Sequence, residues 1–225
     1  MPLPSGTVTF LFSDIEGSTE LLKRLGDALY GDLISEHRRI IRSTFATHDG
    51  HEIDTQGDAF FYSFPRARGA VAAAIEAQRA LTEAEWPRGV LVRVRIGLHT
   101  GEPTMGDEGY TGLDVVRAAR IAAVGRGGQI LLSDATRALL GDALPDGVAV
   151  RSIGQQRLKD IDTPEPLHEL VIDGVAASPS AEPNVRRPDE DEDEIDAAVS
   201  RMTQRIELQV LRQIERSFQD RDRKS

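Results

Sequence analysis

One stretch near the start of the chain, GTVTFLFSDIEGST at residues 6–19, constrains the fold more than any other. An apolar, β-rich run ends abruptly at Asp14, and a turn of Gly, Ser and Thr leads into a long helical pattern. A carboxylate at the end of a buried strand is a hard oxygen ligand suited to Mg²⁺ or Mn²⁺. The backbone N–H groups that open a helix attract anions, so metal and phosphate side by side would suit a nucleotide. The alternative is an ordinary strand followed by an N-capped helix, with Asp14 as a turn residue.

Composition limits the classes of protein to which this chain can belong. Its 225 residues, 40% of them hydrophobic, are enough for one sizeable domain with an appendage. The absence of Cys excludes disulfides, thiolate metal sites and cysteine nucleophiles. A net charge of −10 disfavours binding to nucleic acid. Because the sequence shows neither a signal-peptide pattern nor a bilayer-length apolar stretch, we expect a cytoplasmic protein without a membrane span.

A second carboxylate is predicted at the tip of a hairpin. Residues 51–55 and 59–64 have the composition of two short strands, and Gln56, Gly57 and Asp58 lie between them. Gly57 suits the unusual backbone angles of a tight turn, so Asp58 would be held rigidly. A two-carboxylate metal site needs such a rigid second ligand, although Asp and Gly are also common turn residues with no further role.

The rest of the pattern alternates between helices and strands, which indicates an α+β fold with helices covering a mostly antiparallel sheet. Gly26 and Gly31 interrupt the first helical region, which predicts either two helices, capped by Ser18 or Thr19, or one bent helix. The segment VLVRVRIG at 90–97 alternates, with Arg93 and Arg95 on the face opposite its apolar side chains. Further helices are expected at 67–81, 112–124 and 134–140, further strands at 129–132, 148–153 and 167–172, and a polar loop at 103–109.

Two histidines are expected to be structural. His37 falls near the apolar face of the first helical region, where a satisfied core histidine is the better interpretation. His99 has no Cys or carboxylate at ligand spacing, so packing is favoured over metal binding.

The composition changes at residue 174. A stretch rich in Ala, Ser and Pro is typical of a linker, and an uninterrupted acidic run follows it. Apolar residues then recur at near-helical spacing up to Phe218, with Arg clustered towards the end, which suits the helix dipole. A partly disordered acidic tail is the alternative. We therefore expect a domain at 1–173, a linker with the acidic run at 174–194, and an amphipathic helix or tail at 195–225.

Three stretches together resemble the catalytic domain of class III adenylate and guanylate cyclases. They are FLFSDIEGST at 10–19, DTQGDAFFYSF at 54–64 and YTGLDVVRAARI at 110–121. The segments VRVRIGLHTGE at 92–102 and RLKDIDTPEPLHEL at 157–170 are also similar, so the resemblance covers about residues 6–172. It implies a ferredoxin-like βαββαβ core and head-to-tail homodimers whose active sites are shared between the subunits.

The resemblance also implies a metal site. In the family two Asp residues hold two Mg²⁺ or Mn²⁺ ions, and the matching residues are Asp14 and Asp58, with the Ile15 carbonyl as an added ligand. One ion would activate the ribose 3′-hydroxyl for attack on the α-phosphorus, and the other would hold the triphosphate. Arg120, contributed by the other subunit, matches the transition-state arginine of the family. The expected phosphate-binding residues are Lys159 and the backbone of Glu16, Gly17, Ser18 and Thr19.

The residues that would read the base depart from the family pattern. The usual lysine is replaced by Asp54, its usual partner by Gly109, and the usual asparagine before the arginine by Val116. Loss of the base contacts weakens binding of the base and discrimination between bases, and loss of the asparagine weakens the positioning of the ribose. Because Asp54 can accept a hydrogen bond from the adenine amine, we expect slow conversion of ATP to 3′,5′-cyclic AMP and pyrophosphate. The alternative is a degenerate cyclase-homology module that binds nucleotide or partners without turnover.

Overall fold

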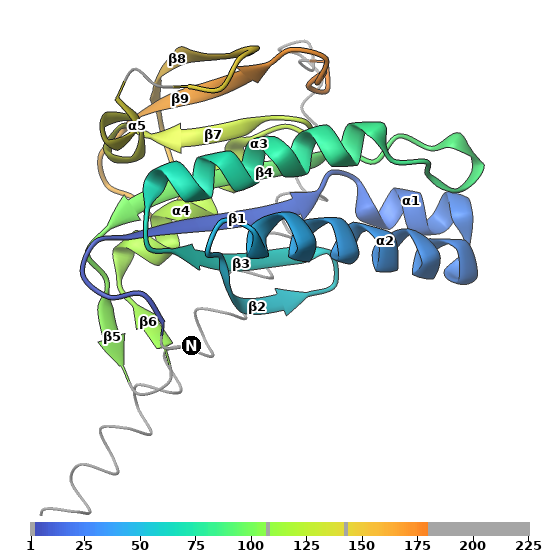
Figure 1. The fold of residues 1–225 in the computed structure, drawn as a ribbon, viewed down its shortest axis with the longest axis horizontal. Coiled ribbons are helices and arrows are strands. Elements are labelled where there is room, and N and C mark those ends of the chain that lie inside the picture. The colour runs from blue at the N-terminus through green and yellow to red at the C-terminus, as the bar shows by residue number, and fades with distance from the viewer. Residues whose placement is uncertain (1–2, 107–108, 142–143, 180–225) are drawn as a thin grey trace, which may run out of the picture.

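The computed structural model describes residues 3–106, 109–141 and 144–179 (Figure 1). The acidic run and the amphipathic helix expected near the C-terminus lie outside these ranges. In chain order, the elements are β1 (Val8–Ile15), α1 (Ser18–Leu25), α2 (Asp27–Ala46), β2 (His51–Gln56), β3 (Ala59–Phe64), α3 (Ala67–Glu83), a 3₁₀ turn (Pro87–Gly89), β4 (Val94–Gly101), β5 (Thr104–Gly106), β6 (Gly109–Thr111), α4 (Leu113–Val124), β7 (Ile130–Ser133), α5 (Asp134–Leu140), β8 (Val148–Gln156) and β9 (Glu165–Ile172).

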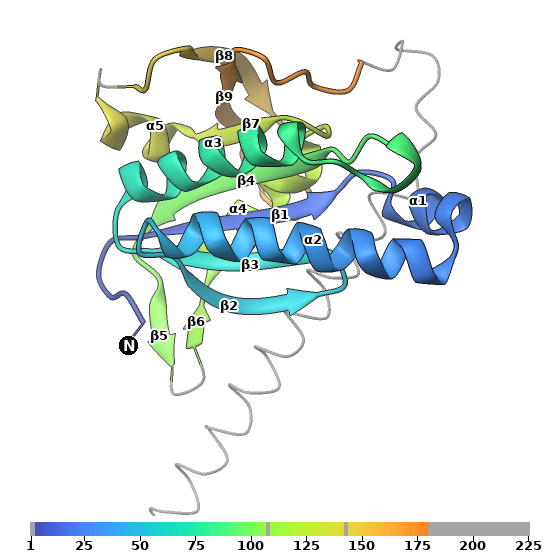
Figure 2. The same cartoon turned by 45° about the vertical axis from the view of Figure 1, so that its right-hand side comes forward.

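A seven-stranded sheet has the order β2-β3-β1-β4-β7-β9-β8, and β4 with β7 is its parallel pair. The first four strands, with α2 and α3, have the strand order of a ferredoxin-like βαββαβ core, as expected from the sequence. Helices α2 and α3 cover one face, and α4 covers the other (Figures 1 and 2). In the part of the chain that the structure describes, no helix combines the length and apolar character needed to cross a bilayer.

Strand β1 lies at the centre because it is apolar on both faces. Leu11 and Ile15 pack into the core under α2 and α3, whereas Phe10 and Phe12 pack against α4. Such a doubly covered strand appears in sequence as a continuous apolar run. Asp14 lies near its end, so a carboxylate is carried at the end of a strand that packing holds in place.

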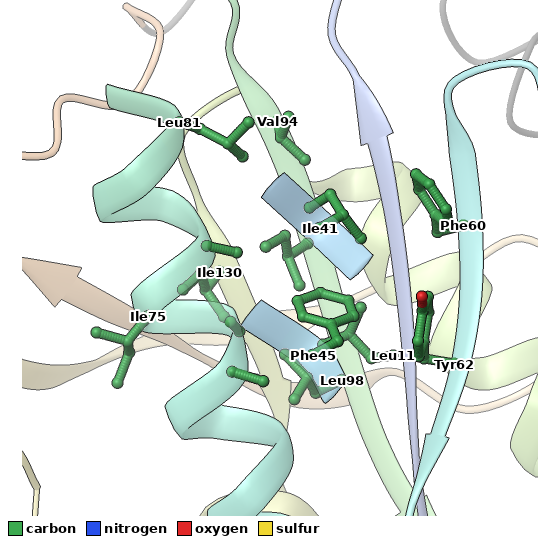
Figure 3. Close-up of a cluster of buried hydrophobic side chains, with 14 of the residues drawn as sticks. Leu11, Ile41, Phe45, Phe60, Tyr62, Ile75, Leu81, Val94, Leu98 and Ile130 are labelled. Carbon is green, nitrogen blue, oxygen red and sulfur yellow. The ribbon is translucent and has the colours of Figure 1, made fainter. Parts of the chain in front are cut away.

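The larger core lies between the sheet and helices α2 and α3 (Figure 3). Phe45 of α2 meets the rings of Tyr62 and Phe64 edge-on, with centroid distances of 4.8 and 5.7 Å. Burying each large apolar side chain contributes about 1.5–3 kcal/mol. Leu11 of β1 is opposite Tyr62 of β3, so this packing fixes the register between the two strands. Strand β1 carries Asp14, and Asp58 lies in the turn just before β3.

The first helical region is divided at Gly26, whose φ of +76° ends α1 and leads into α2. The prediction of two helices is therefore confirmed, and Gly31 lies inside α2. The expected Ser18 or Thr19 cap is wrong. Gly17, with φ of +67°, occupies the N-cap position, where the left-handed backbone favours glycine over any residue with a Cβ.

Two strand predictions also need correction. Strand β4 begins at Val94 rather than at residue 90, because its partner β1 ends at Ile15, which is opposite Val94. The loop expected at 103–109 instead contains β5 and the start of β6, which pair as a small hairpin. Strands of three residues are too short to show a periodic apolar pattern.

His37 of α2 is buried against Phe60, with ring centroids 5.6 Å apart. Neither ring nitrogen has a hydrogen-bond partner within the described ranges. The prediction of a buried core histidine is therefore confirmed, but the prediction that its hydrogen bonds are satisfied is wrong. Burial lowers the pKa of His37 from 6.5 to about 3, and the folded state therefore holds the neutral ring.

Acid should destabilise the protein through His37. Below pH 6.5 the unfolded chain takes up a proton at this ring while the folded chain does not, so stability falls as the pH decreases towards 3. The cost at pH 4.5 is on the order of 3 kcal/mol. His37→Leu should therefore lose less stability than wild type between pH 7 and pH 4.5 in urea unfolding. The half-buried His51, changed to Leu, is the control, and equal losses in His37→Leu and wild type would contradict this account.

Helix α4 packs directly on β4 at Gly97. A Cβ at this position would lie 2.2 Å from the backbone nitrogen of Ala122, a clash that only movement of α4 can relieve. Gly97→Ala is expected to lower the free energy of unfolding by about 1–3 kcal/mol, measured with urea. Gly31→Ala in α2 is the matched control, because its added methyl group meets nothing within 4 Å. If both variants retained wild-type stability, the close approach of α4 to the sheet would be disproved.

Candidate functional site

Asp14 and Asp58 lie together at one end of the sheet. Asp14 is near the end of β1, and Asp58 is in the turn that joins β2 to β3. Strand β3 pairs with β1 so that Phe60 is opposite Ser13, which brings the turn beside the strand end. Asp58 Oδ2 accepts a hydrogen bond from the Ile15 backbone nitrogen at 3.0 Å. The structure thus brings together the two carboxylates predicted as metal ligands.

The Asp14 carboxyl is in an environment that opposes its negative charge. Burial raises its pKa from 3.8 to about 7, and the negative charge of Asp58 adds to the rise, while Arg95 acts in the opposite direction. Two like charges in a buried site are costly unless a cation lies near them. The electrostatics therefore favour a cation at this carboxylate pair.

Arg95 is a site residue that the sequence did not identify. The β1–β4 register places it directly opposite Asp14, and its Nη2 donates to Asp14 Oδ2 at 2.9 Å. Both side chains are nearly inaccessible, at 5% and 7% exposure. The sequence signal was the alternation that set Arg95 on the face opposite Val94 and Ile96. That face is covered by α4, so Arg95 is buried and provides a fixed positive charge for Asp14.

The donor set fits a metal that binds together with a substrate. Within the described ranges, no three His, Asp or Glu side chains are grouped so that they could hold an ion by themselves. Mg²⁺ commonly binds one or two carboxylates and completes its shell with water and substrate phosphates. The Asp14 and Asp58 carboxylates match that arrangement in number, charge and ligand type.

The residues expected to bind phosphate, 16–19, lie at the junction of β1 and α1, where the N–H of Glu16 already has a partner. The Glu16 N–H donates to the Arg93 carbonyl at 2.9 Å, so in this structure it is not directed at a phosphate. The Glu16 carboxylate accepts from the Gly127 N–H at 2.9 Å and from the Ser178 hydroxyl. Gly17 precedes α1, and Ser18 and Thr19 form its first turn, where helix geometry favours anions.

Arg120 and Lys159 are brought close by a loop. Arg120 of α4 is 7% exposed, and its Nη2 donates at 2.7 Å to Oδ2 of Asp160 in the loop between β8 and β9. Lys159 is the residue immediately before Asp160. The two predicted cations therefore belong to neighbouring parts of the fold, although they are 39 residues apart in the chain.

The three base-reading positions retain their unusual character in the structure. The Asp54 carboxylate accepts from the Thr55 N–H at 2.9 Å and from Gln56 Nε2 at 3.1 Å, both within its own strand. Gly109 begins β6 with φ of +129°, and Val116 lies partly buried in α4. None of these three positions matches the family pattern, which has a lysine in place of Asp54, its partner in place of Gly109 and an asparagine in place of Val116.

His99 has carboxylate and hydroxyl contacts that local spacing did not reveal. Its Nδ1 is 2.9 Å from Ser133 Oγ, and its Nε2 is 3.2 Å from Asp114 Oδ1. Asp114 also accepts from Arg117 Nη1 at 3.0 Å. His99 is buried, in line with the expected packing role, and its carboxylate partner comes from α4 rather than from a residue at ligand spacing. The contact ties the start of α4 to β4.

The family model for the "Adenylate and Guanylate cyclase catalytic domain" matches residues 2–165. The chain belongs to this family. An uncharacterised protein of Mycobacterium tuberculosis is 33% identical to the cyclase domain over 169 residues, which cover 74% of this chain and 56% of the relative. An adenylate cyclase of Lachancea kluyveri is 34% identical over 155 residues, covering 58% of this chain and 8% of the fungal protein. The chain thus matches about half of the mycobacterial relative and a small part of the fungal one.

Solved structures support the same assignment of the cyclase fold. A Trypanosoma brucei adenylate cyclase, solved in its monomeric state, has a TM-score of 0.69 and 26% identity, covering 79% of this chain and 96% of that one. The adenylate/guanylate cyclase/hydrolase of Silicibacter pomeroyi has a TM-score of 0.64 and 27% identity. The match covers 74% of this chain and 97% of that one. The α+β cyclase fold expected from the sequence is confirmed.

Proposed function

We propose that this cyclase domain converts ATP to 3′,5′-cyclic AMP and pyrophosphate with two Mg²⁺ or Mn²⁺ ions. The observation that carries the proposal is the meeting of Asp14 and Asp58, with Asp58 bonded to the Ile15 N–H. The raised pKa of Asp14, which burial and the charge of Asp58 cause, supports a cation at this pair. Relatives named adenylate cyclases support ATP as the substrate.

Asp14, Asp58 and the Ile15 carbonyl would hold the two ions. When bound, these ions supply Lewis acidity to the ribose 3′-hydroxyl and neutralise the triphosphate. Arg95 holds the Asp14 carboxylate through a buried ion pair, so this ligand is oriented before any substrate arrives. The first turn of α1, at Ser18 and Thr19, would receive phosphate oxygens through its backbone N–H groups.

Arg120 and Lys159 would act on the substrate held by a second copy in a head-to-tail homodimer. A guanidinium is a permanent, planar cation suited to the charge that develops on phosphoryl oxygens. Lys159 would bind the triphosphate as a point charge. The exposed apolar side chains of Met105 and Leu113 support a protein partner on the side of β5 and the start of α4. In Figure 1 the β5–β6 hairpin projects away from the main sheet.

At the base, Asp54 would favour adenine. An ionised carboxylate has about four lone-pair directions, so Asp54 can accept from the adenine amine while it keeps its bonds to Thr55 and Gln56. Guanine presents a carbonyl at the corresponding position and would be repelled. With Gly109 and Val116 at the neighbouring positions, recognition of the base and orientation of the ribose are weak, and we expect slow turnover.

A second candidate function is a cyclase-homology module that binds nucleotide or protein partners without turnover. Val116 favours it, because a valine can neither donate nor accept the hydrogen bonds of the usual asparagine. Such a module would be stabilised by nucleotide and Mn²⁺, yet it would release no cyclic nucleotide.

The deciding experiment is a cyclase assay on the purified full chain with Mn²⁺ and either ATP or GTP. The double variant Asp14→Ala, Asp58→Ala gives the background. We expect cyclic AMP from ATP above that background, with less cyclic GMP from GTP. If cyclic AMP stays at background, the cyclase proposal is wrong, and a rise in melting temperature with Mn²⁺ and ATP would then favour the binding module.

A further inference from the structure

An ion pair joins the β8–β9 loop to α4. Arg120 Nη2 donates to Asp160 Oδ2 at 2.7 Å, with the Arg120 side chain 7% exposed and that of Asp160 63% exposed. The buried partner is the arginine and the exposed partner is the acid. This differs from Arg66 and Asp49, where both side chains are exposed and an ion pair has little effect on structure.

Packing around the pair explains why these two residues meet. Ile121, which follows Arg120, lies in a hydrophobic cluster with Leu158, and Ile161 packs against the same cluster. The Ile161 N–H donates to the Leu158 carbonyl at 3.2 Å and closes a turn around Lys159 and Asp160. The anchored turn therefore holds the Asp160 carboxylate against α4.

The backbone at Asp160 is in the left-handed region. Its φ is +61°, a left-handed conformation that non-glycine residues rarely adopt, with Asp and Asn the more tolerant types. Residues in such conformations persist where the surroundings fix them. Here the buried Leu158 and the partly buried Ile161 fix the turn on both sides.

We propose that Asp160 is a positioning residue that orients the Arg120 guanidinium for the developing charge on the phosphoryl oxygens. This rests on the proposed cyclase function. The Asp160 carboxylate lies largely in water, so its charge is screened and neutralises the guanidinium only weakly. Its main effect is to limit the directions that Arg120 can take. Because Lys159 is next in the chain, the same turn sets the positions of both cations.

The test uses Asp160→Gly, because Gly adopts a positive φ freely and removes the carboxylate that accepts from Arg120. We expect kcat with Mn²⁺ and ATP to fall about 10- to 100-fold, the effect of a misplaced catalytic group, with KM nearly unchanged. Asp162→Gly, which changes an exposed acid in the same loop, is the matched control and should retain kcat. In an Arg120→Ala background, Asp160→Gly should cause no further loss. A wild-type or raised kcat in Asp160→Gly, or an undiminished loss in the Arg120→Ala background, would overturn the proposal.

A second measurement does not depend on turnover. The Arg120 side-chain Nε–H signal in ¹⁵N–¹H NMR spectra, assigned by its loss in Arg120→Lys, should shift or broaden in Asp160→Gly but not in Asp162→Gly. If wild type makes no cyclic AMP, the proposed function fails, while this signal still tests whether Asp160 orders Arg120. An unchanged signal in Asp160→Gly would rule out the positioning role.

Discussion

Asp58→Asn is expected to abolish cyclase turnover while it leaves the fold intact. Asn keeps an oxygen that can accept from the Ile15 N–H, so the 3.0 Å hydrogen bond to the β2–β3 turn can persist. The substitution removes one of the two negative charges that would hold the ions. Losing an electrostatic group of this kind costs at least about 100-fold in rate. The measurement is cyclic AMP formation with Mn²⁺ and ATP.

The same variant should change how stability depends on pH. The pKa of Asp14 is raised above its unfolded value of 3.8 to about 7, so the metal-free protein loses stability as the pH rises from 4 to 7. Asp58 contributes to that rise, and Asp58→Asn should reduce the loss. Urea unfolding at pH 5 and pH 7 in a chelator measures the difference.

Asp32→Asn, on the exposed surface of α2, is the matched control for Asp58→Asn. It should retain turnover, and Mn²⁺ with ATP should raise its melting temperature as in wild type. Asp58→Asn should show no such rise. Wild-type activity in Asp58→Asn would mean that the two carboxylates do not act together on a metal.

Arg95→Met is expected to cause the largest loss of stability among these substitutions. It leaves the buried Asp14 carboxylate without the guanidinium that donates to it at 2.9 Å. Breaking a buried ion pair from one side typically costs roughly 3–5 kcal/mol. Because Arg95 lowers the pKa of Asp14, its removal raises that pKa further, and the loss should be greater at pH 8 than at pH 5. Urea unfolding at both pH values measures it.

Two further variants test the cause of that loss. Adding Asp14→Asn to Arg95→Met removes the orphaned charge and should recover part of the stability. Arg93→Met, just before β4, should have a small effect, because Met keeps the backbone carbonyl that accepts from the Glu16 N–H at 2.9 Å. An Arg95→Met loss that is the same at both pH values, with no recovery in the double variant, would show that Arg95 acts only through packing.

The sequence predicted the elements whose signals are local. The end of β1 at Asp14 and the turn at Asp58 could be predicted because apolar runs and turn residues are neighbours in the chain. The helix at 112–124, which carries Arg120, was also predicted from its own pattern, whereas the ferredoxin-like core followed from the family resemblance. The short strands β5 and β6 were missed because three residues carry too little pattern to separate a strand from a loop.

The contacts that complete the site depend on strand register and helix packing. Arg95 meets Asp14 only because β4 pairs with β1 in one register, across 81 residues of chain. Asp160 meets Arg120 across 40 residues, and His99 meets Asp114 because α4 lies over β4. In a sequence, each of these is an ordinary charged or polar residue on an alternating strand, in a helix or in a loop. No local spacing distinguishes it from a solvated surface residue.

The contact between Glu16 and Ser178 ties the end of the described chain to the junction of β1 and α1. The Ser178 N–H donates to the Gly127 carbonyl at 2.8 Å, and its hydroxyl donates to Glu16, two residues after Asp14. A pulling force applied beyond residue 179 would load Glu16 and Gly127 before it reached β9. Tethering the protein by this end would therefore strain the junction between β1 and α1 first, close to Asp14 at the end of β1.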